Sequence, residues 1–391
     1  MMPIFIIILS LALIVAVLWD AFETIVLPRR VTRRARLTSL YYRLTWRPWR
    51  TLCLSIKTRK RREALLSVFG PLSLLVLLAL WAASLILSFA LLHWALGTRL
   101  NVADGLHGFA TYLYMSGVIF FTLGFGDVVP VMHMGRVLTV LEAGVGFGFL
   151  ALIIGYLPVI YQGFSAREVN ISLLDARAGT PPTAAELLRR HGRNRDMAAL
   201  NELLKDWERW GAELMESHLS YPVLCYFRSQ HDNQSWLAAL VTILDACALV
   251  MVGVDGAPTW QAQLTFAMAR HAVVDISQIF RAAPRADFSE RLHAEDMSRL
   301  RASLAADGVP LRDGAEADEQ LAKLRRMYEP YVLTLAEFLA MPLSPWINAK
   351  DVVDNWQTSA WERNPQKLAT TFAGVCRGKD MLPQEKEVPS R

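Results

Sequence analysis

Three long apolar segments constrain the fold of this chain more than any other feature. Residues 4–18 are almost free of charge, residues 71–96 contain no Asp, Glu, Lys or Arg, and residues 137–161 contain only Glu142. A helix needs about 20 residues to cross the hydrocarbon core, which the second and third segments exceed and the first reaches by continuing past Asp20. Because a single segment crosses a bilayer only as a helix or as part of a closed barrel, the sequence predicts three transmembrane helices.

A shorter apolar segment lies between the second and third of these helices. Residues 107–121 carry no acidic residue, lysine, arginine or proline, and they are too few to span a membrane. Such a re-entrant segment is tolerated at membrane depth only where it is buried in protein or lines a water-filled path. We therefore expect a short helix whose C-terminal end directs a partial negative charge towards the loop that follows and favours a cation there.

That loop is the hexapeptide TLGFGD, residues 122–127. A ring of backbone carbonyls from four copies of one loop can replace the hydration shell of a potassium ion. Gly124 and Gly126 adopt the required backbone dihedrals without steric cost, and the Thr122 hydroxyl can add an oxygen at the inner mouth. A glycine-rich turn of a soluble loop is the alternative for the hexapeptide alone, but the flanking apolar helices favour the filter.

The segment 71–164 resembles the pore module of the two-transmembrane potassium-channel family of bacteria, over about a quarter of the chain. The resemblance rests on the motif threonine-x-glycine-tyrosine/phenylalanine-glycine-aspartate. It implies that the carbonyls of four consecutive residues coordinate dehydrated potassium and that Asp127 anchors the outer end of the filter. The ion-binding segment predicted in this way comprises Thr122, Leu123, Gly124, Phe125 and Gly126, and the first four supply the carbonyls.

Two residues depart from the commonest form of this motif. Leu123 replaces valine or isoleucine, and Phe125 replaces tyrosine. Phenylalanine lacks the hydroxyl that ties the filter to surrounding aromatic side chains, so the preference for potassium over sodium could be weaker. A weakly selective cation channel is therefore the first alternative to a potassium channel.

One filter loop per chain implies a homotetramer, since a closed pathway needs four loops. A different alternative is a membrane-tethered sensor, receptor or enzyme whose pore is degenerate, against which the intact Gly124/Gly126 pair argues. The chain contains no P-loop and no nucleophile elbow, and the glycines at 144, 146 and 148 follow no predicted strand as a dinucleotide fingerprint would. We expect a channel that is no enzyme and needs no cofactor, with K⁺ as the permeant ion.

The orientation in the membrane follows from charge. Residues 28–69 hold thirteen Lys or Arg against one acid, Glu63, and basic loops stay on the cytoplasmic side. The N-terminus and the filter mouth with Asp127 should then face outwards in a multi-pass protein of the bacterial inner membrane. The arginines lie in a polar stretch, so voltage sensing is not expected, and the first apolar segment lacks the basic start of a secretory signal.

The distribution of charge also indicates the partners. The basic pI of 9.1 belongs to the loop 28–69, because residues 163–391 carry 26 basic against 30 acidic side chains. Anionic lipid head groups are the natural counter-charge for a basic loop beside a membrane. Membrane lipids and further copies of the chain are the expected partners, and no nucleic acid is expected.

The third transmembrane helix carries the candidates for a gate and for support of the filter. Glycines in membrane helices usually permit close packing, whereas a glycine hinge followed by a proline kink could let the lower half of the helix swing; both interpretations remain open. Glu142 lies at a depth where a charge is costly unless it is paired or hydrated, and it could brace the filter or the pore helix. The gate or hinge candidates are Gly144, Gly146, Gly148, Gly155 and Pro158.

Residues 164–382 predict an all-helical cytoplasmic domain, after an N-terminal helix (1–27), a basic linker (28–69) and the pore module (70–163), and before a disordered tail (383–391). Thr183 can cap a helix, with Glu186 three residues later. Residues 236–252 are apolar but short and contain Asp245, so a buried helix is favoured over a fourth crossing.

The polar residues of this domain predict structural roles. His271 and Asp275 share a helix face and favour an ion pair over a catalytic dyad, and His231, Asp232 and Asn233 form the other polar group. The four cysteines have no spacing typical of a metal site, and we expect them to be reduced. These cysteines are Cys53, Cys225, Cys247 and Cys376.

Overall fold

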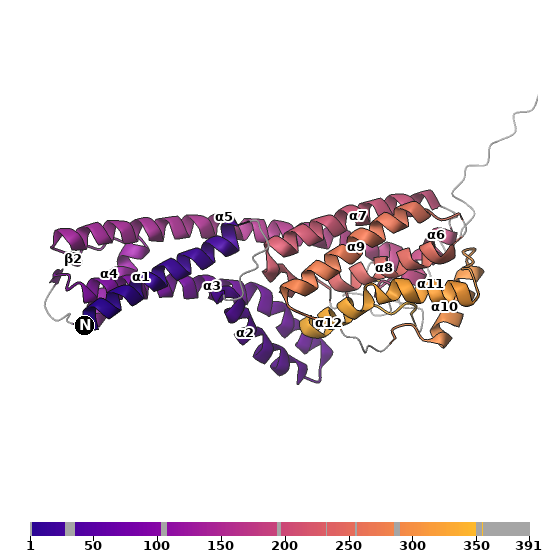
Figure 1. Cartoon of the computed structure of the whole chain (residues 1–391), viewed down its shortest axis with the longest axis horizontal. Coiled ribbons are helices and arrows are strands. Elements are labelled where there is room, and N and C mark those ends of the chain that lie inside the picture. The colour runs from indigo at the N-terminus through magenta and orange to yellow at the C-terminus, as the bar shows by residue number, and fades with distance from the viewer. Residues whose placement is uncertain are drawn as a thin grey trace, which may run out of the picture. The chain divides into compact units, whose positions relative to one another are not determined.

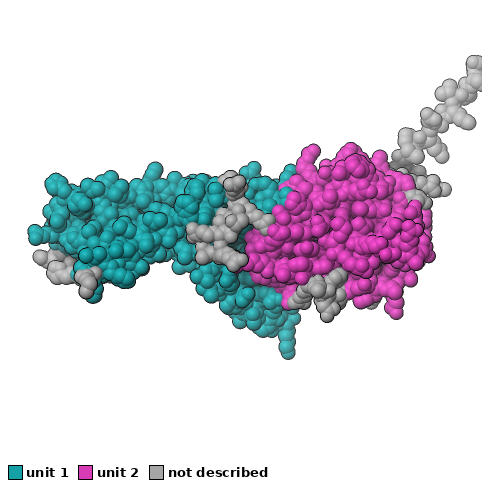
Figure 2. All heavy atoms as spheres, in the orientation of Figure 1, with its two compact units in different colours: residues 1–167, 213–232 teal, residues 168–212, 233–391 magenta. Residues whose placement is uncertain are grey.

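The computed structural model describes residues 2–27, 36–102, 108–193, 197–231, 233–254, 256–284, 290–348 and 354. The predicted disordered tail, Cys376, Asp232 and the arginines at 29, 30, 33 and 34 lie outside the described residues. Two compact units divide the chain (Figure 2). The first comprises residues 1–167 and 213–232, and the second comprises residues 168–212 and 233–391.

The first unit contains the three predicted membrane helices and the loop of residues 122–127 (Figure 1). Trp81 and Leu85 of one helix pack with Phe120 and Phe149 of two others in the core of this unit. The elements in chain order are α1 (Met2–Ala21), the π-helical turn η1 (Phe22–Val26), α2 (Leu37–Leu54), α3 (Arg59–Ala95), β1 (Leu100–Val102), α4 (Phe109–Phe120), β2 (Val128–Pro130) and α5 (His133–Ala178).

The predicted all-α membrane fold is confirmed. Four helices among the described residues are long and apolar enough to cross a membrane, and three of them are α1 with its η1 extension, α3 and α5. Two helices are longer than their apolar segments: α3 begins at Arg59 and α5 continues to Ala178, with Pro71 and Pro158 inside them. The predicted basic linker is itself largely helical, because α2 buries one face that includes Trp46 and Cys53.

A buried carboxylate joins the ends of the first helices. Asp20 Oδ2 accepts hydrogen bonds from the backbone N–H and the hydroxyl of Thr38, at 3.0 and 2.6 Å, and from Trp81 Nε1 at 3.2 Å. The carboxylate therefore satisfies a free N–H in the first turn of α2, where a negative charge is favourable. An acidic residue at the end of α1 thus fixes the start of α2.

The second unit is helical and is built around one buried helix. Nine-tenths of α8 is buried inside the unit (89%), so protein covers its apolar surface. This burial favours the predicted interpretation of residues 236–252 as a core helix, although its length and composition would also suit a crossing. Besides residues of α5 and α7 (Met197–Ser220), the unit contains α6 (Ala184–Arg193), α8 (Trp236–Gly253), α9 (Thr259–Ile279), α10 (Ala294–Ala306), α11 (Ala315–Arg326) and α12 (Glu329–Leu339).

Residues 213–232 belong to the first unit, although the chain reaches them after passing through the second. This stretch contains the end of α7 and the 3₁₀ turn η2 (Pro222–Tyr226). The buried Arg167 of α5 donates hydrogen bonds to the carbonyls of Leu224 and Phe227, both at 3.0 Å. A single domain boundary at 163/164, as predicted from the sequence, would assign residues 213–232 to the cytoplasmic domain, whereas they belong to the first unit.

Candidate functional site

The short helix α4 leads directly into the TLGFGD loop. It ends at Phe120, and the hydrogen bonds of its last turn extend into the loop. The N–H of Thr122 binds the carbonyl of Ile119 at 2.9 Å, and that of Leu123 binds the carbonyl of Val118 at 2.9 Å. The carboxyl end of α4, with its partial negative charge, is thus tied to the first two loop residues.

The backbone of the loop alternates in handedness. Thr122, Gly124 and Gly126 have φ of +56°, +64° and +76°, whereas the intervening Leu123 and Phe125 stay outside the left-handed region. A carbonyl-lined ion path needs successive carbonyls on one side of the loop, and alternation of left- and right-handed residues is compatible with that requirement. Glycine is favoured at 124 and 126 because a Cβ would be strained there.

The loop is not covered by its own chain. Leu123 is 55% exposed and Phe125 is 65% exposed, although both are large apolar side chains. No heavy atom lies within 4 Å of a Cβ built on Gly124 or Gly126, apart from those of their chain neighbours. Exposed apolar side chains of this kind mark a surface that contacts another protein or the membrane.

The Asp127 end of the loop is anchored by a tyrosine that the sequence did not predict. Tyr114 of α4 donates a hydrogen bond from its hydroxyl to Asp127 Oδ2 at 2.8 Å. Beyond Asp127, β2 pairs antiparallel with β1. No local sequence pattern points to Tyr114, because its contact with Asp127 joins two separate parts of the chain.

Glu142 is buried where three helices meet. Its Oε2 lies 3.6 Å from Nε2 of His93 in α3, and the buried Ser116 of α4 lies near its carboxylate without a hydrogen bond to it. Nδ1 of His93 is 3.2 Å from the Thr98 hydroxyl. The structure therefore places the predicted support residue against the pore helix, and it adds His93 and Ser116, which the sequence analysis did not single out.

The glycines of α5 differ in their surroundings. A Cβ on Gly146 would lie 2.1 Å from the carbonyl oxygen of Phe120, so this glycine permits α5 to contact the end of α4. A Cβ on Gly144, Gly148 or Gly155 would meet no atom within 4 Å. Gly146 thus has the close-packing role, and the other three lie on open surface of the helix.

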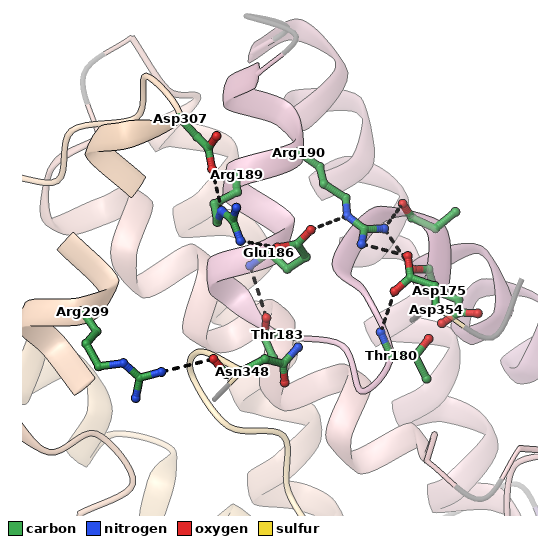
Figure 3. Close-up of polar contacts among 11 residues, drawn as sticks. Asp175, Thr180, Thr183, Glu186, Arg189, Arg190, Arg299, Asp307, Asn348 and Asp354 are labelled. Carbon is green, nitrogen blue, oxygen red and sulfur yellow. Dashed lines mark hydrogen bonds and ion pairs between the residues drawn. The ribbon is translucent and has the colours of Figure 1, made fainter. Parts of the chain in front are cut away.

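The second unit holds a polar cluster around the start of α6 (Figure 3). Thr183 Oγ1 accepts the N–H of Glu186 at 3.2 Å, so the predicted helix cap is confirmed. The Glu186 carboxylate binds Arg189 and Arg190, and Arg190 also binds Asp354 at 2.8 Å. Acids and arginines alternate in this cluster, which is typical of a structural network.

A second network lies inside the same unit. Arg291 binds both carboxylate oxygens of Asp245, at 3.1 and 2.7 Å, and Tyr328 donates its hydroxyl to the same carboxylate. Arg291 and Arg325 both contact Glu329. Two arginines thus balance two carboxylates. The network therefore joins α8, α11 and α12 and leaves no net charge for a ligand.

The other polar residues add no further site. His271 Nε2 lies 3.6 Å from Asp275 Oδ2 on an exposed helix face, as a structural ion pair would. Within the described residues no group of three or more His, Cys, Asp or Glu could hold a metal ion. Cys53, Cys225 and Cys247 are buried free thiols, and burial raises the pKa of the Cys225 thiol.

Comparison with known proteins supports one part of the chain specifically. Residues 74–162 match the ion-channel family Ion_trans_2. The match covers α4, the TLGFGD loop and the greater part of both helices that flank them. The chain is thus a membrane protein with an ion-channel domain in its first unit.

A bacterial membrane protein is similar over a longer stretch. The uncharacterized membrane protein YdjJ of Bacillus subtilis (strain 168) is 20% identical over 191 residues. The alignment covers 48% of this chain and 55% of YdjJ, so it spans little more than half of that relative. No solved structure matches the chain.

Proposed function

We propose that this chain is one of four identical subunits of a potassium-selective channel in the bacterial inner membrane. The observation that carries the proposal is the alternating backbone of Thr122, Gly124 and Gly126, directly after a short apolar helix and between two spanning helices. Carbonyls of residues 122–125 replace the hydration shell of K⁺, and the α4 dipole stabilises the ion on the inner side.

Two contacts hold this filter in shape. The Tyr114–Asp127 hydrogen bond ties the outer end to the pore helix. Glu142, with His93 and Ser116, braces the pore helix from behind. Both contacts come from the same chain, so each subunit positions its own quarter of the ring.

The surface that the single chain leaves uncovered supports the proposed tetramer. Leu123 and Phe125 of the loop and Val140, Phe147 and Ile154 of α5 are exposed. The last three residues recur every seven positions, so they lie along one side of the helix. In the tetramer these side chains line the inner path or contact the neighbouring subunit.

Gating is proposed to act through the two helices that contribute residues to both units, α5 and α7. Movement of α5 at Gly144, Gly148, Gly155 or Pro158 would change the inner mouth, whereas Gly146 stays at its contact with α4. The proposal does not assign gating to voltage, because the apolar windows of the candidate spans among the described residues carry no series of arginines. The second unit lies in the cytoplasm, and the N-terminus faces outwards.

A weakly selective cation channel is the second candidate. Phe125 is the observation that favours it, since this exposed side chain has no hydroxyl to hold the filter at a fixed width. Both candidates share the ion path, so a measurement of potassium and sodium side by side separates them.

The experiment is ion flux in liposomes containing the purified chain, under potassium or sodium gradients. Gly124→Asp places a side chain at φ +64° in the path and should abolish flux. Gly308→Asp is the matched control, since Gly308 has φ +81° and open space but lies in the second unit. Potassium flux that only Gly124→Asp removes supports the proposal; equal sodium flux supports the second candidate; flux unchanged by Gly124→Asp contradicts both.

A further inference from the structure

The helix α2 and the first turns of α3 form a hairpin that takes no part in the proposed ion path. In Figure 1 this hairpin runs in a different direction from α1 of the same unit. Residues 36–69 of the hairpin carry nine Lys or Arg and one acid. That acid, Glu63, lies 3.4 Å from Arg228, and Arg36 at the start of the hairpin lies 3.5 Å from Glu23. Basic side chains therefore greatly outnumber acidic ones within the hairpin itself.

One face of α2 is fixed against the protein. The Trp46 ring lies 4.8 Å from the Phe69 ring and 5.0 Å from the Tyr226 ring, between centroids. Trp49 donates its indole N–H to the carbonyl of Leu65 at 3.2 Å. These contacts, with that of Thr38 to Asp20, determine which face of α2 points away from the protein.

The outward face is apolar and basic. Leu37, Leu40 and Leu44 recur at the spacing of one helix side, and Leu40 and Leu44 are 48% and 64% exposed. Arg43 and Arg47 lie beside them and are exposed. The turn and the start of α3 add exposed basic side chains, namely Lys57, Arg59, Lys60 and Arg61.

We propose that α2 lies in the membrane interface and binds the phosphates of anionic phospholipids. The leucines enter the boundary of the acyl chains, while Arg43 and Arg47 pair with head groups beside them. The membrane is the occupant because the hairpin is continuous with α3, which crosses the bilayer and exposes Leu72 and Leu75 to it. The proposal goes beyond ion conduction and does not depend on it.

The test is quenching of a fluorophore on Leu44→Cys by spin-labelled lipid, in the full chain reconstituted in nanodiscs. Cys376→Ser removes the one native thiol outside the described residues, and the other three are buried. The nanodiscs contain phosphatidylcholine alone or a three-to-one mixture with phosphatidylglycerol. A label at Leu75 reports lipid in both, and a label at Lys323, in the second unit, reports water.

The proposal expects stronger quenching at residue 44 in phosphatidylglycerol, with the gain reversed by high salt. Arg43→Gln/Arg47→Gln should lower the interfacial equilibrium constant about fivefold per arginine removed. Arg43→Lys/Arg47→Lys should keep the effect, and so should Lys205→Gln/Lys323→Gln, which removes two exposed charges of the second unit. Equal quenching in both lipids, or a gain that survives the glutamine substitutions, would overturn the proposal. Absence of quenching would also overturn the proposal, and it would favour an acidic protein as the partner of the outward face of α2.

Discussion

Single residues decide how firmly the filter loop is held. Thr122 is β-branched yet has φ +56°, a backbone conformation that costs an L-residue roughly 1–2 kcal/mol. The loop thus retains a strained residue beside two glycines that are not strained. Contacts at the ends of the loop, at Ile119 and at Asp127, offset this cost.

Tyr114→Phe tests the outer contact. The substitution removes the hydroxyl that binds Asp127 but keeps the ring, so folding should be unaffected. We expect the permeability ratio of potassium to sodium to fall about fivefold, which corresponds to roughly 1 kcal/mol for one hydrogen bond. Reversal potentials in planar bilayers measure the ratio, with Tyr331→Phe in the second unit as the control. An unchanged ratio would show that Asp127 is held by other contacts.

Gly146→Ala tests the contact between α5 and α4. The added methyl would lie 2.1 Å from the Phe120 carbonyl oxygen, and we expect a loss of about 1–3 kcal/mol from overpacking. Gly148→Ala, two residues later and in open space, should be neutral or stabilising, since alanine favours a helix. Thermal unfolding in detergent compares the two variants. Equal transition temperatures would mean that α5 does not approach α4 so closely.

At the scale of elements, the stretch 213–232 depends on a buried histidine. His218 Nε2 lies 3.2 Å from Arg167 Nη1, and burial, followed by the charge of Arg167, lowers the pKa of His218 well below 6.5. The folded state therefore binds a proton at His218 less readily than the unfolded state. The contribution to stability is complete above about pH 6.5 and is lost as the pH falls towards the folded pKa.

Acidification should therefore weaken this element. Between about pH 6.5 and about pH 5.5 we expect His218 to remove up to about 1.4 kcal/mol of stability. Thermal unfolding against pH measures the loss, and His218→Gln should flatten the curve in that window. His271→Gln, at an exposed histidine, serves as the control. A wild-type curve that is already flat there would contradict a buried neutral His218.

Elements were more predictable than their ends. The apolar segments predicted α1, α3 and α5 because a bilayer requires a minimum apolar length. Hydropathy does not show how far a helix extends into charged sequence, so it missed the start of α3 at Arg59 and the end of α5 at Ala178. The positive φ at residues 124 and 126 could be predicted because glycine there reflects a local backbone requirement. Tyr114, His93 and Ser116 were missed because their roles depend on contacts between separate elements, which no local pattern records.

At the scale of the whole molecule, the single chain leaves the TLGFGD loop uncovered. Leu123, Phe125 and one side of α5 are exposed, and the proposed tetramer would bury them. We expect light scattering in mild detergent to give the mass of four chains. Phe147→Arg should disrupt that assembly by placing a charge at the uncovered surface, whereas Val169→Arg, in the second unit, serves as a comparison. A monomer that conducts ions would contradict a tetrameric pore.

The order of the two units along the chain limits which truncations and gene fusions keep the first unit intact. It leaves the first unit after Arg167, returns for residues 213–232 and leaves again. A stop codon after residue 170 would delete Leu224 and Phe227, which cap Arg167, whereas one after residue 232 would keep them. A gene fusion at a single splice point after Arg167 therefore carries residues 213–232 of the first unit along with the second unit, and the first unit that is left behind loses the carbonyls that bind Arg167.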